Sequence, residues 1–557
     1  MADQPIKNIS GEVDGASTEG HVFDTEETYT TPGAKVAVFK TGGNTVASIA
    51  RDGTISSANE VLVSPDEGFA GIDSAVTSLN ASGGGKIVLL DGEYSMGSSL
   101  YTWTEIENIE IVGKGDATKI MLDTSPGVPL FITGTVKGTT SVPVNDTTAG
   151  DTSITFTTPA NAGTYLKGYW ISLALTDDET GDSQCELVKV AADGNPGTGV
   201  VDLEWPVGRD GTSVTAWGCK PAENIKISNL RFIRENAPGG TERFMDLQYL
   251  FNFTLDSVSF ETDDATGASD HAFRSTGYSG FWHVHRNRIV NTTRMGMHIT
   301  GTSYSEFTNN YFMNSCQSDF SDSSCIWISG RVRHTLVKNN QFVYSKQYGV
   351  RFDATSGYSP YFMTIKDNEF LGIENTAINI GATKDTIIEG NKGDWGGFQK
   401  SGSGVGVSMA GAERCRITNN TFVGCAFGIG VSTASKCTIN HNTIYGRYYG
   451  DGISCGGNGN NISNNVITNV GYGITVGSDA QRNVISSNTV VDVGSTHAIR
   501  VNTTAHNNVF IGNVLMGCNN AINLAATTYD NIMIGNQGGE EGIVDAGTNN
   551  QQIGNFV

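Results

Sequence analysis

The hydrophobic positions in the second half of the chain recur in short alternating groups. One group reads Ile417-Thr418-Asn419-Asn420-Thr421-Phe422, and a turn later Gly428-Ile429-Gly430-Val431 follows. Alternation of apolar and polar residues is typical of strands with one buried face. The phrase returns every 19 to 30 residues, a period that suits coils of three short strands. We therefore predict an all-β fold, a parallel β-helix whose coils stack into a solenoid.

Stacked coils place like residues over like residues. With strands about 4.8 Å apart, a dozen coils form a rod on the order of 60 Å long. The Gly-Ile-x-Val phrases supply one inward column, and the strand before the Asn phrase supplies another. That second column consists of Val284, Phe307, Val337, Ile365, Ile388, Ile417 and Ile439.

An asparagine marks one point of each repeat. A buried turn removes backbone polar groups from water, and an Asn amide can bond both to them and to the Asn of the next coil. Asn also tolerates the left-handed backbone of a tight turn. We expect Asn229 to be an earlier member and Ser257 to take the Asn place in the coil between. The column contains Asn287, Asn310, Asn340, Asn368, Asn391, Asn420, Asn442, Asn465, Asn488, Asn513, Asn536 and Asn555.

The first coils have their own pattern. Ile72, Ala75, Val76 and Leu79 have helical spacing, which predicts a helix that caps the open end of the rod. Separate alternating strands interrupt the repeat further on, and an earlier Gly-Gly-Asn turn indicates a hairpin. These shifts divide the chain into an N-terminal β-rich attachment or assembly segment (1–58), the β-helix entrance with its capping helix (59–129), a small inserted β-subdomain (130–222) and the main β-helix (223–557).

Two entrance segments carry a family resemblance. The segment GGGKIVLLDGEY (83–94), the strand IEIVGKG (109–115) and the Asn-x-Phe/Ile coils resemble the pectate-lyase-like right-handed parallel β-helix superfamily, which includes phage tailspike depolymerases. The resemblance covers residues 60–557. It implies a polysaccharide partner, a homotrimer, and an extracellular or virion-associated protein. The superfamily contains lyases, hydrolases, epimerases and adhesins, so the resemblance defines the fold more narrowly than the chemistry.

Charge and cysteine content limit the classes of partner and ligand that the chain could bind. A formal charge of −22 argues against nucleic acid, whose phosphates are neutralised by Lys and Arg. We find no signal peptide and no membrane-spanning run. The nine cysteines lack metal-type spacing, and Cys415 and Cys437 either stack as thiols or form a disulfide. We expect no cofactor; Asp177-Asp178-Glu179 and Asp263-Asp264 are weak calcium candidates.

The middle of the chain departs from this acidic balance. Residues 270–370 hold 10 Lys and Arg, five of the nine His, and only seven Asp and Glu. A basic stretch on an acidic rod predicts an anionic ligand. The alternative interpretation is that these bases balance neighbouring acids or lie at a subunit contact.

The outward position of the Gly-Ile-x-Val strand concentrates this chemistry. Successive coils place Arg274, His298, Trp327 and Arg351 there, followed by Asn379. Later coils place the smaller Gly406, Gly430, Ser454 and Thr475 there. An aromatic face can stack on a sugar ring, and Arg can pair with its acid group. We expect substrate contacts from Arg274, Trp327, His283, His285, Arg294 and Lys346.

Two cleavage chemistries and one binding role remain open. In β-elimination of a uronate, Arg274 or Arg351 neutralises the carboxylate, His298 is the base and Tyr348 is the acid. A glycoside hydrolase needs two carboxylates instead, for which Asp353, Asp322 and Asp319 are candidates, with Asp270 more remote. The local basic excess favours elimination of an acidic extracellular or capsular polysaccharide. A non-catalytic adhesin or spike is the rival, and no metal is expected in the site.

Overall fold

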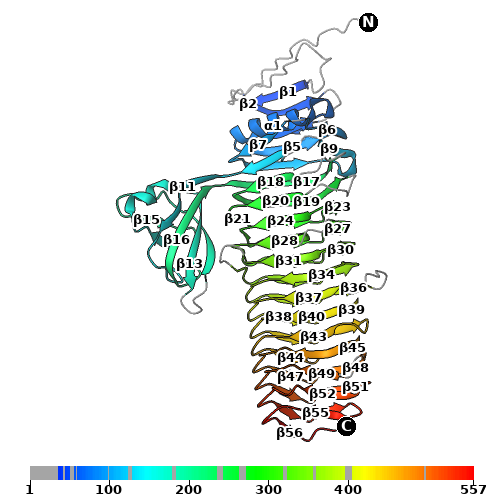
Figure 1. The fold of residues 1–557 in the computed structure, drawn as a ribbon. Coiled ribbons are helices and arrows are strands. Elements are labelled where there is room, and N and C mark those ends of the chain that lie inside the picture. The colour runs from blue at the N-terminus through cyan, green and yellow to red at the C-terminus, as the bar shows by residue number, and fades with distance from the viewer. Residues whose placement is uncertain are drawn as a thin grey trace, which may run out of the picture.

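A computed structural model describes residues 35–41, 44–50, 55–57, 59–97, 99–122, 128–177, 183–234, 243–262, 271–317, 323–354, 359–395, 404–494 and 497–556. Nearly all of the regular structure is β-strand, and parallel strands stack along a rod with the N-terminal elements at one end and the C-terminus at the other (Figure 1). The predicted parallel β-helix is therefore confirmed. No helix among these residues has the length and apolar character needed to cross a membrane.

Three parallel sheets form the sides of the rod. The first, here called the long sheet, has 15 strands. In stacking order they are β7 (Tyr101–Thr104), β10 (Leu130–Thr133), β18 (Arg243–Gln248), β20 (His271–Thr276), β24 (Met295–Thr300), β28 (Ser324–Ser329), β31 (Tyr348–Asp353), β34 (Thr376–Ile380), β37 (Val405–Met409), β40 (Phe427–Val431), β43 (Asp451–Cys455), β46 (Tyr472–Val476), β49 (His497–Val501), β52 (Asn520–Leu524) and β55 (Gly542–Asp545).

The strand that follows in each coil belongs to what we call the second sheet. Its members are β4 (Glu60–Val63), β5 (Gly85–Leu89), β8 (Glu107–Val112), β17 (Ala222–Arg234), β19 (Leu250–Thr262), β22 (His283–His285), β26 (Glu306–Thr308), β29 (Leu336–Lys338), β32 (Thr364–Lys366), β35 (Ile387–Glu389), β38 (Arg416–Thr418), β41 (Thr438–Asn440), β44 (Asn461–Ser463), β47 (Val484–Ser486), β50 (Val509–Ile511), β53 (Ile532–Ile534) and β56 (Gln551–Ile553). The short strands β21 (Ser279–Gly280) and β25 (Thr302–Ser303) precede two of them.

The third sheet completes each coil. It contains β6 (Gly92–Ser95), β9 (Thr118–Leu122), β23 (Arg288–Val290), β27 (Tyr311–Met313), β30 (Gln341–Val343), β33 (Glu369–Leu371), β36 (Lys392–Asp394), β39 (Thr421–Cys425), β42 (Thr443–Gly446), β45 (Val466–Val470), β48 (Thr489–Val493), β51 (Val514–Met516) and β54 (Gln537–Gly538). The long strands β17 and β19 pair with neighbours in both the second and third sheets, and so join them.

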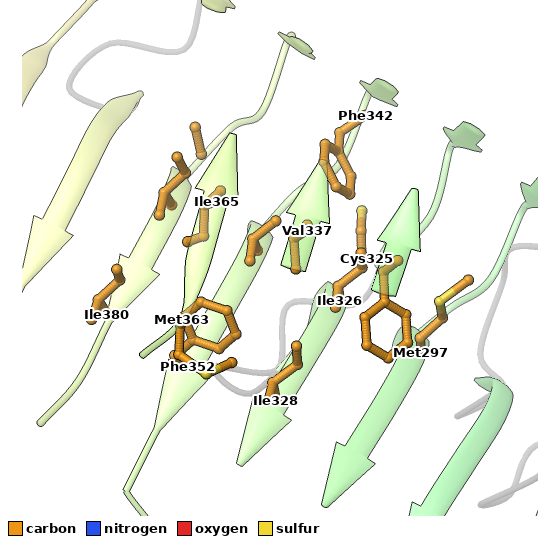
Figure 2. Close-up of a cluster of buried hydrophobic side chains, with 14 of the residues drawn as sticks. Met297, Cys325, Ile326, Ile328, Val337, Phe342, Phe352, Met363, Ile365 and Ile380 are labelled. Atoms are coloured by element: carbon orange, nitrogen blue, oxygen red, sulfur yellow. The ribbon is translucent and has the colours of Figure 1, made fainter. Parts of the chain in front are cut away.

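The core lies between the three sheets. Figure 2 shows Ile326, Ile328 and Phe352 of the long sheet turned toward Val337 and Ile365 of the second sheet. All five side chains are fully buried. Burial of this kind provides most of the favourable free energy of folding, at about 25 cal/mol for each Å² of apolar surface.

The predicted Asn ladder runs through the corner between the second and third sheets. From Asn287 to Asn555, each side-chain Nδ2 donates to the Oδ1 of the next asparagine at 2.8–3.0 Å. The left-handed residue is the one before each ladder Asn, not the ladder Asn itself: Asn419 has φ 57 and precedes Asn420. Asn229 and Ser257, with φ 55 and 56, occupy this preceding position, so the prediction that they take ladder places is wrong by one residue.

A second ladder was missed. At the corner between the long and second sheets, Asn483, Asn508, Asn531 and Asn550 bond in the same way, and the backbone amide of Asn460 donates to Asn483 Oδ1. The ladder ends at Cys437, whose amide donates to Asn460, while the amide of Cys415 donates to the Cys437 sulfur at 3.4 Å. These two cysteines are buried free thiols and not a disulfide. They take the place of asparagine in two coils.

The entrance and the insertion frame the first coils. Helix α1 (Gly68–Ala81) buries Phe69, Ile72, Ala75, Val76 and Leu79 against the end of the rod, as the helical spacing predicts. Before it, β1 (Lys35–Thr41), β2 (Asn44–Ala50) and β3 (Ile55–Ser57) form an antiparallel sheet. Strand β10 pairs with β7 and β18, so residues 130–133 belong to the rod and not to the insertion.

The insertion is a small antiparallel subdomain on one side of the rod (Figure 1). It is docked through buried contacts: Trp170 stacks on Phe251 of β19 at 4.2 Å, and Arg333 pairs with Glu186 at 3.9 Å. The subdomain therefore packs beside the coils that carry the basic stretch. Its strands are β11 (Thr135–Pro143), β12 (Ser153–Thr155), β13 (Trp170–Asp177), β14 (Ser183–Lys189), β15 (Val200–Asp202) and β16 (Gly211–Lys220).

Candidate functional site

One outward column of the long sheet brings the predicted residues together. Parallel pairing places Arg274 beside His298, His298 beside Trp327, and Trp327 beside Arg351. The same column begins one strand earlier at Asp246. We call these five residues the site column. Neighbouring members lie 24 to 29 residues apart in sequence, and only in-register stacking makes them adjacent.

Aromatic rings and a guanidinium form the lower half of the site column. The His298 and Trp327 rings stack with centroids 4.4 Å apart and planes 6° apart. The Arg351 guanidinium lies 5.2 Å from the Trp327 ring and 5.1 Å from the Tyr348 ring. Asp353 accepts from Trp327 Nε1 at 3.1 Å and pairs with Arg351 Nε at 2.5 Å. These contacts hold the indole and the guanidinium in fixed orientations, as preorganised recognition requires.

His298 is held in its neutral form. Burial lowers its pKa well below the usual value, and the nearby His271, Arg274, Arg243 and Arg294 lower it further. Its Nε2 lies 3.2 Å from the Thr300 hydroxyl. A neutral imidazole can accept a proton at neutral pH, and an anion placed beside it would raise its pKa.

A buried carboxyl group at the upper end of the site column was missed by the sequence reasoning. Burial raises the pKa of Asp246, although the Arg243 and Arg274 guanidinium groups oppose that shift. Arg243 forms an ion pair with Asp246. The sequence of the strand Arg243–Gln248 could have revealed Asp246, because this strand alternates like its neighbours. The large insertion before the strand hid its place in the repeat.

Three arginines lower the pKa of His298: Arg274, Arg243 and Arg294. Of these, Arg243 forms an ion pair with Asp246. The Arg274 guanidinium has no ion-pair partner among the described residues, and its buried Nε has no hydrogen-bond acceptor there. A partly buried guanidinium without a partner is costly, and a bound carboxylate would relieve that cost.

Several predicted residues do not join this cluster. His283 and His285 lie on β22 of the second sheet, where they face Glu306 at 3.8 Å and Asp256 at 3.6 Å. These two histidines lie on a different sheet from Trp327, because the chain turns a corner after β20, and their substrate contact stays a prediction. Lys346 precedes β31, at the start of the coil that carries Tyr348 and Arg351.

The remaining carboxylate candidates cannot form a hydrolytic pair from the described residues. Asp246 and Asp353 lie on strands four steps apart, which corresponds to about 19 Å. Paired carboxylates in glycosidases are about 5 to 9.5 Å apart. Asp270, Asp319 and Asp322 lie outside the described residues, as do Asp178, Glu179, Asp263 and Asp264 of the calcium candidates. Where the structure is described, no cluster of three His, Cys, Asp or Glu side chains could hold a metal ion.

Several bases of residues 270–370 form ion pairs with acids on neighbouring coils of the rod. Arg286 pairs with Asp256 at 2.5 Å, Arg288 with Glu261 at 2.6 Å, and Lys366 with Glu389 at 3.1 Å, all on the second and third sheets. The interpretation that bases balance neighbouring acids therefore holds on those faces. On the long sheet Arg243 and Arg351 are paired as well, with Asp246 and Asp353.

Beyond Arg351, the outward column of the long sheet differs from the sequence prediction at one coil. Asn379 pairs with Ser408, and Ser408 with Gly430. Gly406, which was predicted to hold this outward place, is buried two residues earlier. The column also does not end in small residues, since Thr475 is followed by Arg500.

Comparison with known proteins supports the fold. Residues 398–557 match the family described as right handed beta helix region. No curated protein sequence matches the chain.

Solved structures with a similar chain path include two phage tailspikes and an adhesin. The Gp54 tailspike of Acinetobacter baumannii bacteriophage AP22, solved with capsular saccharide, is 14% identical over 86% of this chain and 73% of its own, with a TM-score of 0.41. The tailspike of E. coli bacteriophage HK620, solved with a hexasaccharide, is 12% identical over 90% and 80%, with a TM-score of 0.46. The adhesin PfbA of Streptococcus pneumoniae is 12% identical over 83% and 91%, with a TM-score of 0.42. The family match and the strand stacking together identify this chain as a right-handed parallel β-helix.

Proposed function

We propose that the chain binds an acidic polysaccharide along the site column and cleaves it by β-elimination. The observation that carries this proposal is the Arg274 guanidinium, which has no ion-pair partner among the described residues and lies beside His298, whose pKa burial lowers well below its usual value. A uronate carboxylate supplies the missing negative charge. The Trp327 ring lies between His298, on which it stacks at 4.4 Å, and the Arg351 guanidinium at 5.2 Å, and so holds both groups in place beside the bound sugar.

The proposed reaction needs a base, a neutralised carboxylate and a proton for the leaving oxygen. Arg274 pairs with the uronate carboxylate, which makes the adjacent C–H more acidic. His298 takes that proton, the C–H electron pair forms the new C=C bond, and the glycosidic C–O bond breaks. The leaving oxygen then takes up a proton.

The proton donor has two candidates. Tyr348, favoured from the sequence, lies two strand steps from His298, which corresponds to about 10 Å. The His271 ring is closer, with its centroid 6.1 Å from that of His298. A donor must reach the oxygen next to the carbon that loses its proton, so we propose His271 ahead of Tyr348.

The test is incubation of the full chain with polygalacturonate, alginate and hyaluronan. Elimination gives new reducing ends together with the ultraviolet absorbance of an unsaturated uronate. Reducing ends without that absorbance would replace elimination by hydrolysis, and binding without either product would favour the adhesin. Absence of binding to every acidic polymer would overturn the proposal. The Arg274→Gln variant should lose binding, whereas Arg416→Gln, an exposed arginine on β38 of the second sheet, should not.

The biological setting is part of the same proposal. Capsular and other extracellular polysaccharides lie outside the cell, so we place the protein there or on a virion. The support is the resemblance of the entrance and coil motifs to tailspike depolymerases, which also suggests a homotrimer.

A further inference from the structure

A second cluster with the chemistry of the first lies further along the long sheet. The Arg500 guanidinium stands 4.0 Å from the centre of the Tyr472 ring, as Arg351 stands over Tyr348. Arg500 belongs to the same outward column as Arg351, reached through Asn379, Ser408, Gly430, Ser454 and Thr475. Six strand spacings separate the two arginines, or about 29 Å.

Arg500 resembles Arg274 in the partners that its guanidinium lacks. Among the described residues its guanidinium has no ion-pair partner, and its buried Nε has no hydrogen-bond acceptor. Burial raises the pKa of Asp451, and the Thr475 hydrogen bond, Arg500 and the Ser454 hydrogen bond oppose that shift. Asp451 does not form an ion pair with Arg500 among the contacts of the described residues.

Aromatic side chains lie beside this arginine and on the coils before it. Phe427 is 42% exposed and Tyr449 is 82% exposed. Tyr449 lies two residues before Asp451 in the chain, and Phe427 begins β40, the strand next to the one that Asp451 begins. Tyr472 continues that edge of the long sheet, and its ring stacks on His497 with centroids 6.2 Å apart. Exposed rings in a line beside a cation suit a glycan, whose sugar rings have apolar faces and polar edges.

The column between the two clusters carries no bulky side chain. Its central members are Ser408, Gly430 and Ser454, whose side chains are short or absent. Within this column, a polymer that lies on Arg274 and Trp327 meets only short side chains between Arg351 and Arg500.

We propose that Arg500, Tyr472, Tyr449 and Phe427 form a second binding subsite for the same acidic polysaccharide. This subsite holds the chain about 29 Å from Arg351 and makes binding bivalent for long polymers only. The inference rests on the proposed function, because it takes the same polymer as ligand.

The experiment compares long and short ligands on the full-length protein. Affinity electrophoresis in gels with polygalacturonate or alginate measures polymer binding, and calorimetry with uronate trisaccharides, which are too short to span the two clusters, measures each cluster separately. Arg500→Gln and Tyr449→Ala should each weaken polymer binding about five- to tenfold. They should leave the trisaccharide affinity of the first cluster unchanged and remove only the second binding event. The matched controls are Arg416→Gln and Tyr445→Ala, exposed side chains on the second and third sheets, which should change neither.

The outcomes separate the two proposals. Full polymer affinity in both Arg500→Gln and Tyr449→Ala overturns the second subsite and leaves the first cluster intact. Loss of polymer binding in these variants but not in Arg274→Gln overturns the first cluster and keeps the second. A change of sedimentation coefficient with unchanged polymer binding shows that this surface is a contact between copies of the chain, which also overturns the subsite.

Discussion

Replacement of a single ladder asparagine should destabilise the coil that contains it. Asn391 is fully buried and makes four side-chain hydrogen bonds. It donates to the Ile365 carbonyl at 3.0 Å and to Asn420 Oδ1 at 2.9 Å. It also accepts from the amide and the side chain of Asn368, at 3.0 and 2.9 Å. Asn391→Ala removes all four bonds. Asn420 Oδ1 still accepts from the backbone amide of residue 391 and Asn368 Nδ2 still donates to the Val337 carbonyl, so the Asn368 amide and the Ile365 carbonyl are the groups that lose a partner without such a substitute.

The size of the effect follows from those groups. Each buried polar group left unsatisfied costs about 1–3 kcal/mol, and neighbouring groups partly re-pair, so we expect a loss of roughly 4 kcal/mol. Because a solenoid does not unfold as one two-state unit, the loss is best measured locally. Hydrogen exchange at the Asn368 amide should accelerate nearly a thousandfold, since about 1.4 kcal/mol corresponds to a factor of ten.

The control is Asn461→Ala on β44. That side chain is exposed, and the structure assigns it no hydrogen bond. If Asn391→Ala accelerates exchange by less than tenfold, or no more than Asn461→Ala does, the ladder does not stabilise the corner and the reasoning fails.

Four further results are expected. His298→Ala should lower cleavage at least about a hundredfold without a change in the urea unfolding midpoint, because this residue serves as base and not as core; retained cleavage would rule out the base. Ile417→Asp should prevent folding, seen as loss of soluble protein, since it buries an unpaired charge in a fully buried position. Asn419→Ala should cost about 1 kcal/mol at φ 57 while Asn419→Gly costs nothing, and equal midpoints would contradict this. His334, whose pKa burial and Arg333 lower to about 4, is neutral in the folded protein but takes up a proton below about 6.5 when unfolded; stability should fall from pH 6.5 toward 4, and the slope should be smaller in His334→Gln.

The stacking of the coils was predictable because it depends on a repeated pattern. Every ladder Asn from 287 to 555 was found from spacing alone, and the outward column from Arg274 to Arg351 followed from the Gly-Ile-x-Val phrase. In a solenoid each coil contacts only its neighbours, so a local phrase determines the long-range contact.

The failures occur where the phrase is ambiguous. Where two asparagines are adjacent, as at Asn419 and Asn420, composition does not tell which one is left-handed and which joins the ladder. Strand β37 contains Gly406 and Ser408 two residues apart, and either fits the repeat with the same face outward. The second ladder is short and begins with cysteines, so its period is hard to see. Proximity in sequence also did not show that a corner separates His283 and His285 from the long sheet.

The unpartnered arginines are explained by the separation of core and surface in this fold. Backbone groups of each coil bond to the coils on either side, and the ladders satisfy the corners, so an outward side chain adds little to folding. Arg274 and Arg500 therefore are not required for the rod, and their unpaired guanidinium groups carry a cost that no described residue offsets. The first coils show that the chain can pair surface bases when only the rod matters, as Arg286 does with Asp256. The arginines of the long sheet differ because their partner is expected to be a ligand, and the polymer that neutralises both must lie along the column that joins them.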